Sequence, residues 1–408
     1  FLGLHGYNFY FCTYGKNTGN ATINSYSKSK SFYKNFIITC KDILYSAFYS
    51  KISIHKNEIF EFDYENIIVT WSEKKQFKKD GSFNDNILNT NSQKIKKTLW
   101  FVIYMDREIP KKFNKNIVLL RPLKNKFFNI LFLFKKFLST IKEIIKSNSF
   151  NLHHFSSYSI FASLVDHQFK KFLHKDVKLI IMPYESQPFQ NRIFLTAQEF
   201  SKTIKTLGYV HSPPEAMPTH VIRKKGDPKK IILNGLDQVF CYTKYLNWKK
   251  KDIQVLDSIR FKKSKKSFLN KIFLPIFLEN EDKIFKSLNF LYTRKIIDLK
   301  NYEVRPHPHS KSRKESSNLI KKINNLSKLS HKFKKNKKMS IFIGATGAAI
   351  EHLERGNEAI HISFNPILEI YSNEFYPSIK ATKINENIYR YKLLKKGRII
   401  RLGKDKNN

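Results

Sequence analysis

The sequence predicts an α/β protein, and three observations support this prediction. Short apolar runs rich in β-branched and aromatic residues recur along the chain, as in TLWFVIYM (Thr98–Met105). Stretches with helical spacing of apolar residues lie between these runs. The chain has 408 residues, of which 41% are hydrophobic, so it can bury a sizeable core. Repeated alternation of strands and helices is typical of a sheet covered by helices.

The first half of the chain shows this alternation in order. Strands are expected at Asn66–Trp71, Thr98–Met105, Asn116–Pro122 and Val177–Glu185, with a loop at Asn84–Lys97. Helices are expected at about Lys124–Asn148 and Ser156–Lys175, and Asn191–Ser212 reads as a helix followed by a short strand. The segments Lys229–Gly235, Val239–Leu246 and Ile253–Phe261 continue the alternation.

A charged break, KKSKKS (Lys262–Ser267), precedes a second series of elements. The strands expected there are Phe268–Asn280, the start of Asn301–His309, Ser340–Ile343 and the EAIHISF segment, with a helix at Ser317–Phe333. We therefore predict two domains, residues 1–265 and 266–408. No internal repeat of fixed period is visible.

The composition limits the partners and cofactors of the protein. The formal charge of +42 fits either a polyanionic partner or a coding bias toward A/T-rich codons, because lysines are spread along the whole chain. No nucleic-acid module signature is present, so we expect no specific nucleic-acid partner. Three cysteines without CxxC spacing predict no zinc site or disulfide framework and indicate a cytoplasmic protein. We expect no cofactor.

The most apolar stretch is FFNILFLFKKFLSTIKEII (Phe127–Ile145), which Lys135 and Lys136 interrupt. It is too short and too charged for a membrane span, and it predicts a basic amphipathic helix. Such a helix either packs on the core or docks on an anionic membrane surface, which would make the protein peripheral at the inner face of the cell membrane. The chain begins with Phe, so a preceding targeting segment is left open.

One turn combines features of a phosphate site. The strand Ser340–Ile343 leads into Gly344, Ala345, Thr346 and Gly347, and a short helix is expected from Ala348 to Arg355. Small residues allow a ligand to approach the backbone, and the N–H groups at a helix start favour a phosphate. The alternative is a tight strand-to-helix turn in which glycine and alanine serve only packing.

A second segment, RPHPH (Arg305–His309), follows a strand end, and we expect this strand to be adjacent to the one that leads to Thr346. His307 between two prolines is held in a stiff backbone, from which it could donate to a phosphate or protonate a leaving oxygen. Arg305 adds charge, or it is a structural ion-pair partner. The alternative for the segment is a surface loop with solvated histidines.

A third and a fourth segment lie in the first half. Glu185 ends a strand in MPYESQPFQNR and could act as a general base on an acceptor hydroxyl. Gln187 and Arg192 follow it, and the alternative is an ordinary helix start. The Pro-rich loop Gly208–His220, which contains His211 and Ser212, also follows a strand, where ligands bind in open α/β sheets. The alternative is a surface connection.

Together, in this order, these segments resemble a GT-B type glycosyltransferase of bacterial surface-polysaccharide (capsule or O-antigen) biosynthesis, with sialyltransferase-like and Kdo-transferase-like relatives. The resemblance covers about residues 178–364. It rests on an acidic residue (Glu185), an HP motif (His307–Pro308) and a Ser/Thr turn (Thr346). The chain has Glu-Ser-Gln where the relatives have two acidic residues and Gly, and Thr346 is followed by Gly347.

The resemblance implies two Rossmann-like domains facing each other across a cleft. A nucleotide-sugar donor, with a CMP-linked sugar favoured, would bind through His307, Arg305 and the Gly344–Ala348 turn. Glu351 could accept a hydrogen bond from a ribose hydroxyl, and the alternative is a solvated glutamate on the helix. Glu185 would be the base, and the acceptor, a glycan or lipid-linked molecule, would enter past Gln187, Arg192, His211 and Ser212. Because no DxD pair or metal cluster stands in the right place, we expect metal-independent transfer. A sugar-nucleotide epimerase and a noncatalytic basic envelope protein are the alternatives.

Overall fold

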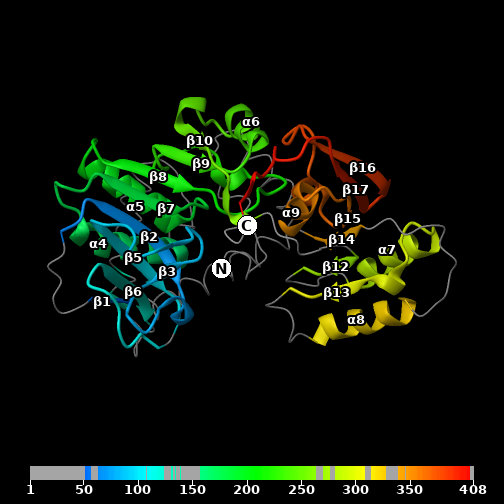
Figure 1. The fold of residues 1–408 in the computed structure, drawn as a ribbon, viewed down its shortest axis with the longest axis horizontal. Helices are drawn as coiled ribbons and strands as arrows, with labels where there is room; N and C mark the ends of the chain where they lie inside the picture. The colour runs from blue at the N-terminus through cyan, green and yellow to red at the C-terminus, as the bar shows by residue number, and fades with distance from the viewer. Residues whose placement is uncertain are drawn as a thin grey trace.

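A computed structural model describes most of the chain (Figure 1). The described residues are 51–56, 63–106, 108–123, 130, 131, 134, 138, 157–262, 270–275, 281–307, 314–327, 339–344 and 346–404. They form two α/β units, each built around one large sheet. The predicted fold class, α/β with two Rossmann-like units, is confirmed.

The sheet of the first unit has eight strands in the order β1-β6-β5-β2-β7-β8-β9-β10. All pair in parallel except β1, which is antiparallel to β6. Counted along the chain from β2, the strands from β6 to β9 follow the order 3-2-1-4-5-6, which is the doubly wound Rossmann order. Their bounds are β1 Lys51–Lys56, β2 Asn66–Ser72, β5 Thr98–Tyr104, β6 Ile117–Leu123, β7 Leu179–Pro183, β8 Lys205–Tyr209, β9 Lys230–Leu233 and β10 Ile253–Val255.

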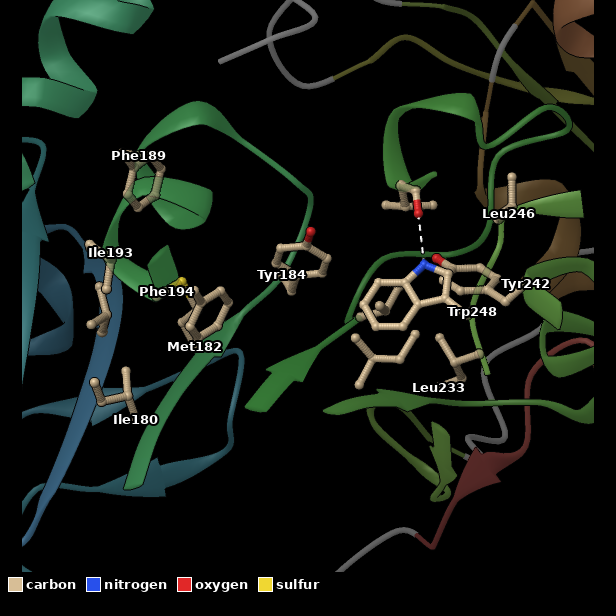
Figure 2. Close-up of a cluster of buried hydrophobic side chains, with 14 of the residues drawn as sticks. Ile180, Met182, Tyr184, Phe189, Ile193, Phe194, Leu233, Tyr242, Leu246 and Trp248 are labelled. Carbon is tan, nitrogen blue, oxygen red and sulfur yellow. Dashed lines mark hydrogen bonds between the residues drawn. The ribbon is translucent and has the colours of Figure 1, made fainter. Parts of the chain in front are cut away.

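Both faces of this sheet are covered, which explains the nearly continuous apolar strands; every residue of β5 is buried. Helices α4 (Ser157–Phe169), α5 (Pro188–Phe200) and α6 (Leu236–Tyr245) belong to the unit, and Figure 2 shows α5 placing Phe189, Ile193 and Phe194 beside β7. Trp248 Nε1 donates to the Val221 carbonyl at 2.8 Å, and the dashed line at Trp248 in Figure 2 marks this bond. An aromatic cluster of Phe83, Trp100 and Tyr104 forms a separate core on the sheet.

The segment Asn84–Lys97, predicted to be a loop, contains two short paired strands, β3 (Asn84–Asp85) and β4 (Thr90–Asn91). Each is only two residues long, which is below the length at which alternation can be recognised in sequence. The predicted long helix after β6 falls largely outside the described residues. Positions 130, 131, 134 and 138 are described, and all four have helical backbone.

The second unit has a six-stranded sheet in the order β13-β12-β14-β15-β17-β16. The first four strands are parallel and follow the doubly wound order 2-1-3-4, and β17 and β16 extend the sheet as an antiparallel hairpin. The strands are β12 Lys271–Phe273, β13 Glu303–Arg305, β14 Ser340–Ile343, β15 Ala359–Ile362, β16 Ile379–Asn385 and β17 Ile388–Leu393. The helices are α7 Glu281–Thr293, α8 Lys314–Ser327, α9 Ala348–Glu354 and α10 Pro366–Glu369.

The last described segment of the chain returns to the first half. Strand β18 (Leu402–Gly403) pairs in parallel with β11 (Ser258–Lys262), and Arg401 N donates to the Asn234 carbonyl at 2.6 Å. The buried carboxylate of Glu354 in α9 accepts from the backbone N–H groups of Ile399 and Ile400 at 2.8 and 2.9 Å. This segment therefore joins the two units, and a domain boundary near residue 265 stays a prediction.

Among the described residues, no helix combines the length and the apolar character that a bilayer crossing requires.

Candidate functional site

The candidate site begins at the position where the strand order of the first sheet reverses. Strands β2 and β7 are neighbours there. The strands of this sheet that come between β2 and β7 in the chain, β5 and β6, lie on one side of this position, and those that follow β7 lie on the other. In open α/β sheets, ligands bind outside the carboxyl ends of the strands at this reversal. Glu185 lies two residues after the end of β7 and therefore stands at this point.

The Glu185 carboxylate is held by several neighbouring donors. Ser212 Oγ donates to Oε1 at 3.0 Å, and Gln187 Nε2 donates to Oε2 at 2.9 Å. His211 Nε2 lies 3.4 Å from Oε1. The side chain keeps 29% of its surface exposed, so a ligand can reach it. The structure thus brings together Glu185, Gln187, His211 and Ser212, which the sequence placed in two separate segments.

The backbone around Glu185 is fixed by Gln190. Its Oε1 accepts from the N–H groups of Glu185 and Gln187 at 2.9 and 3.0 Å, and its Nε2 donates to the Pro183 carbonyl at 2.6 Å. Ser186 has a φ of +55°, in the left-handed region that non-glycine residues seldom adopt. This backbone conformation turns the chain sharply from β7 into α5 beside Glu185.

His211 lies behind Glu185 and is only 3% exposed. Burial lowers the pKa of His211, and Arg260 lowers it further, although Glu185 acts in the opposite direction. The imidazole is therefore neutral at pH 7. Its ring lies edge-on to Trp71 at the end of β2, with ring centroids 5.7 Å apart. Nδ1 is buried and has no hydrogen-bond partner among the described residues.

The turn after β14 lies at the corresponding point of the second sheet, where β12 and β14 are neighbours. Gly344 has a φ of +68°, and a Cβ there would lie 3.4 Å from Cβ of Pro275, which follows β12. The Gly344 carbonyl is bonded to Nε2 of buried His361 at 2.9 Å. The glycine is therefore required by its backbone conformation and lies beside the end of β12.

The rest of this turn has internal contacts. Thr346 Oγ1 accepts from the N–H of Ala348 at 3.4 Å, which resembles a helix cap. Glu351 forms an ion pair with Arg355 at 2.7 Å, one turn further along α9. Ala345 falls outside the described residues. These contacts give Thr346 and Glu351 structural partners in addition to their predicted ligand roles.

The two units touch at Gly347. A Cβ added to Gly347 would lie 2.6 Å from Cγ of Pro213, in the loop that follows β8. In the same loop the Pro214 carbonyl accepts from the hydroxyl of buried Tyr371 at 2.9 Å, and the Glu215 carbonyl accepts from Tyr376. The Glu185 cluster and the Gly344–Ala348 turn are thus joined through one loop, because Ser212 precedes Pro213 directly.

His307 and Arg305 lie at the edge of the second sheet. We predicted that His307 and Thr346 follow adjacent strands, and this is wrong, since β12 lies between β13 and β14. Strand order cannot be read from local sequence patterns. All three strands are parallel, so both residues still lie at the carboxyl side of the sheet. The Arg305 guanidinium is exposed and bonded to Glu303 at 2.9 Å.

Arg192 lies apart from the Glu185 cluster. Its Nε is 3.2 Å from Oδ2 of Asp166 in α4, so the side chain points to the neighbouring helix. Asp166 is buried and also accepts from Thr196, which makes this a structural contact. We therefore leave Arg192 out of the site proposed below.

Three residues that shape the site were not predicted from the sequence: Trp71, Tyr371 and Tyr376. None stands in a recognisable motif, and all act through contacts between segments far apart in the chain. The only sequence signal is the place of Trp71 near a strand end. Among the described residues, no group of three or more His, Cys, Asp or Glu side chains is arranged to hold a metal ion.

Comparison with known proteins finds a distant match to a solved structure but no match by sequence. No protein-family model matches the sequence, and no curated protein shows significant sequence similarity. A crystal structure of α,α-trehalose 6-phosphate synthase from Burkholderia multivorans aligns with 74% of this chain and 82% of its own. The sequence identity is 8% and the TM-score is 0.38.

Proposed function

We propose that the protein is a glycosyltransferase that moves a sugar from a nucleotide-activated donor to a hydroxyl group of a glycan or lipid-linked acceptor. The observation that carries this proposal is the position of Glu185. Its accessible carboxylate stands at the strand-order reversal of the first sheet, beside a loop that touches the Gly344–Ala348 turn at the reversal of the second. Each strand-order reversal is a position at which an α/β sheet binds a ligand, and the two lie next to each other here. This arrangement suits a reaction between two bound substrates.

In the proposed reaction Glu185 takes the proton of the acceptor hydroxyl. The freed oxygen forms a bond to the anomeric carbon of the donor sugar, and the bond from that carbon to the phosphate oxygen breaks. The nucleotide leaves with the electron pair of the broken bond. Ser212 and Gln187, which donate to the two carboxylate oxygens, hold Glu185 in one orientation for the transfer. His211 packs behind it as a neutral imidazole.

On the donor side, we propose that His307 and the Gly344–Ala348 turn face the phosphate. Backbone N–H groups and an imidazole can stabilise the charge that develops on the leaving phosphate. Because the Arg305 guanidinium already pairs with Glu303, we propose that it contributes less than His307 to stabilising the leaving phosphate. Following the resemblance, a CMP-linked sugar is the first donor to test. The proposed role is surface-polysaccharide synthesis at the cytoplasmic face of the membrane, and the proposed transfer needs no metal ion.

The test is release of free nucleotide from a panel of CMP-, UDP- and GDP-linked sugars, with and without a mixture of glycan acceptors. The proposal predicts acceptor-dependent release by the wild-type protein that survives a chelator and is strongly reduced in Glu185→Gln. Glu199→Gln is the matched control, because Glu199 is exposed at the far end of α5. Conversion of the sugar without nucleotide release would instead support an epimerase. No turnover of any donor would contradict both.

A further inference from the structure

The described residues that follow β6 include an apolar helical face. Ile130, Leu131, Phe134 and Leu138 have helical backbone and are 67%, 71%, 60% and 45% exposed. At about 100° per residue, these four positions fall within an arc of about 100° on one side of a helix. They therefore form a single stripe, which we call the apolar helical face.

This clustering differs from the other exposed hydrophobic side chains of the described residues. Those are Met105, Phe200, Leu236, Leu256 and Leu394, and each lies in a different segment. Single exposed apolar residues are normal on a protein surface, whereas a continuous apolar stripe marks an interaction site. Nothing in the proposed reaction uses the stripe.

The charge of the surrounding sequence indicates what the face binds. Between Lys124 and Lys146 the sequence contains six lysines and one acidic residue, Glu143. Apolar residues beside lysines are typical of helices that lie in the headgroup region of anionic membranes, where lysine side chains reach the lipid phosphates. A second copy of this chain would bring the same excess of positive charge to the contact, and like charges repel.

We propose that the apolar helical face docks the protein on an anionic lipid bilayer, with Ile130, Leu131, Phe134 and Leu138 inserted among the lipid headgroups and nearby lysines paired with lipid phosphates. This inference is independent of the proposed glycosyl transfer. It rests on exposure, helical spacing and charge.

The experiment is co-sedimentation of the whole protein with vesicles of phosphatidylcholine alone and with vesicles that also contain phosphatidylglycerol. We expect the wild-type protein to bind the anionic vesicles and the binding to weaken as salt is raised. Leu131→Glu with Phe134→Glu lowers the binding at least about tenfold, because two large side chains no longer enter the bilayer. Leu394→Glu with Phe200→Glu is the matched control: it places the same charges at exposed apolar positions elsewhere and leaves binding unchanged.

A second variant, Lys135→Glu with Lys136→Glu, separates charge from apolar insertion and is also expected to weaken binding. Equal vesicle binding by wild type and the Leu131/Phe134 variant would overturn the proposal, as would no binding to anionic vesicles. Concentration-dependent dimerisation in sedimentation velocity, lost in the same variant, would assign the face to a second copy of the chain and would also overturn it.

Discussion

Gly347 of the second unit packs directly against Pro213 of the first. A Cβ on Gly347 would lie 2.6 Å from Cγ and 2.8 Å from Cβ of Pro213, closer than real side chains approach. This contact gives a structural reason for a glycine at this position, beside the predicted one of leaving room for a phosphate. Both functions can share one residue, since the same loop continues to Ser212 and Glu185.

Gly347→Ala tests this contact. We expect the variant to lose about 1–3 kcal/mol of stability, because the added methyl group forces the two loops apart. Pro213→Gly removes the opposing ring and should reduce the penalty of the alanine when the two substitutions are combined. Urea unfolding of the four proteins gives the coupling energy. Strictly additive effects would show that the two residues do not meet.

Tyr371 and Tyr376 hold the same loop by donating hydrogen bonds to its backbone carbonyls. Tyr371→Phe leaves the Pro214 carbonyl without its donor in a buried position and should cost about 1–3 kcal/mol. Faster amide exchange at Glu215 and Ala216 should accompany the loss, because the loop is released. Tyr245→Phe serves as the control, since its hydroxyl bonds to Glu374 at an exposed position. A variant as stable as the wild type, with unchanged exchange, would contradict the role.

Two buried histidines predict a pH dependence of stability. Burial lowers the pKa of His352 and of His361 to about 4, from 6.5 in the unfolded chain. Between these values the unfolded chain binds more protons than the folded protein, so stability falls as the pH drops from 6.5 toward 4. The loss approaches roughly 3 kcal/mol per histidine.

His361→Gln should make the stability less dependent on pH in this window while keeping a donor for the Gly344 carbonyl. Urea midpoints measured across the range check the prediction. A wild-type protein with constant stability over the window would show that these histidines are not buried as described.

His307 is the predicted phosphate contact on the donor side. His307→Ala should weaken binding of the donor nucleotide severely and leave the fold intact, because the side chain lies beyond the end of an edge strand. Calorimetry with cytidine and uridine nucleotides measures the affinity. The matched control is His167→Ala, an exposed histidine in α4. An unchanged affinity in His307→Ala would remove this residue from the site.

The sequence predicted the parts of the molecule that depend on local patterns. Apolar runs such as Thr98–Met105 identified buried strands, and Glu185 and His211 were placed near strand ends, where they prove to be neighbours. The order of strands was beyond reach, because pairing depends on the whole chain; β12 therefore separates His307 from Thr346 unexpectedly. The contacts of Gly347 with Pro213 and of Tyr371 with Pro214 also join distant segments that no spacing rule relates.

Whether Glu185 is the general base is tested most directly by the acceptor-dependent turnover of Glu185→Gln, with donor-nucleotide affinity and thermal stability determined on the same protein. A general base is worth about 10²–10⁴-fold in rate. We predict a loss of that size in transfer, with nucleotide affinity and stability close to wild type, because Glu185 belongs to the first unit and is partly exposed. Near-normal turnover, or a parallel loss of activity and stability, would show that Glu185 is not the general base.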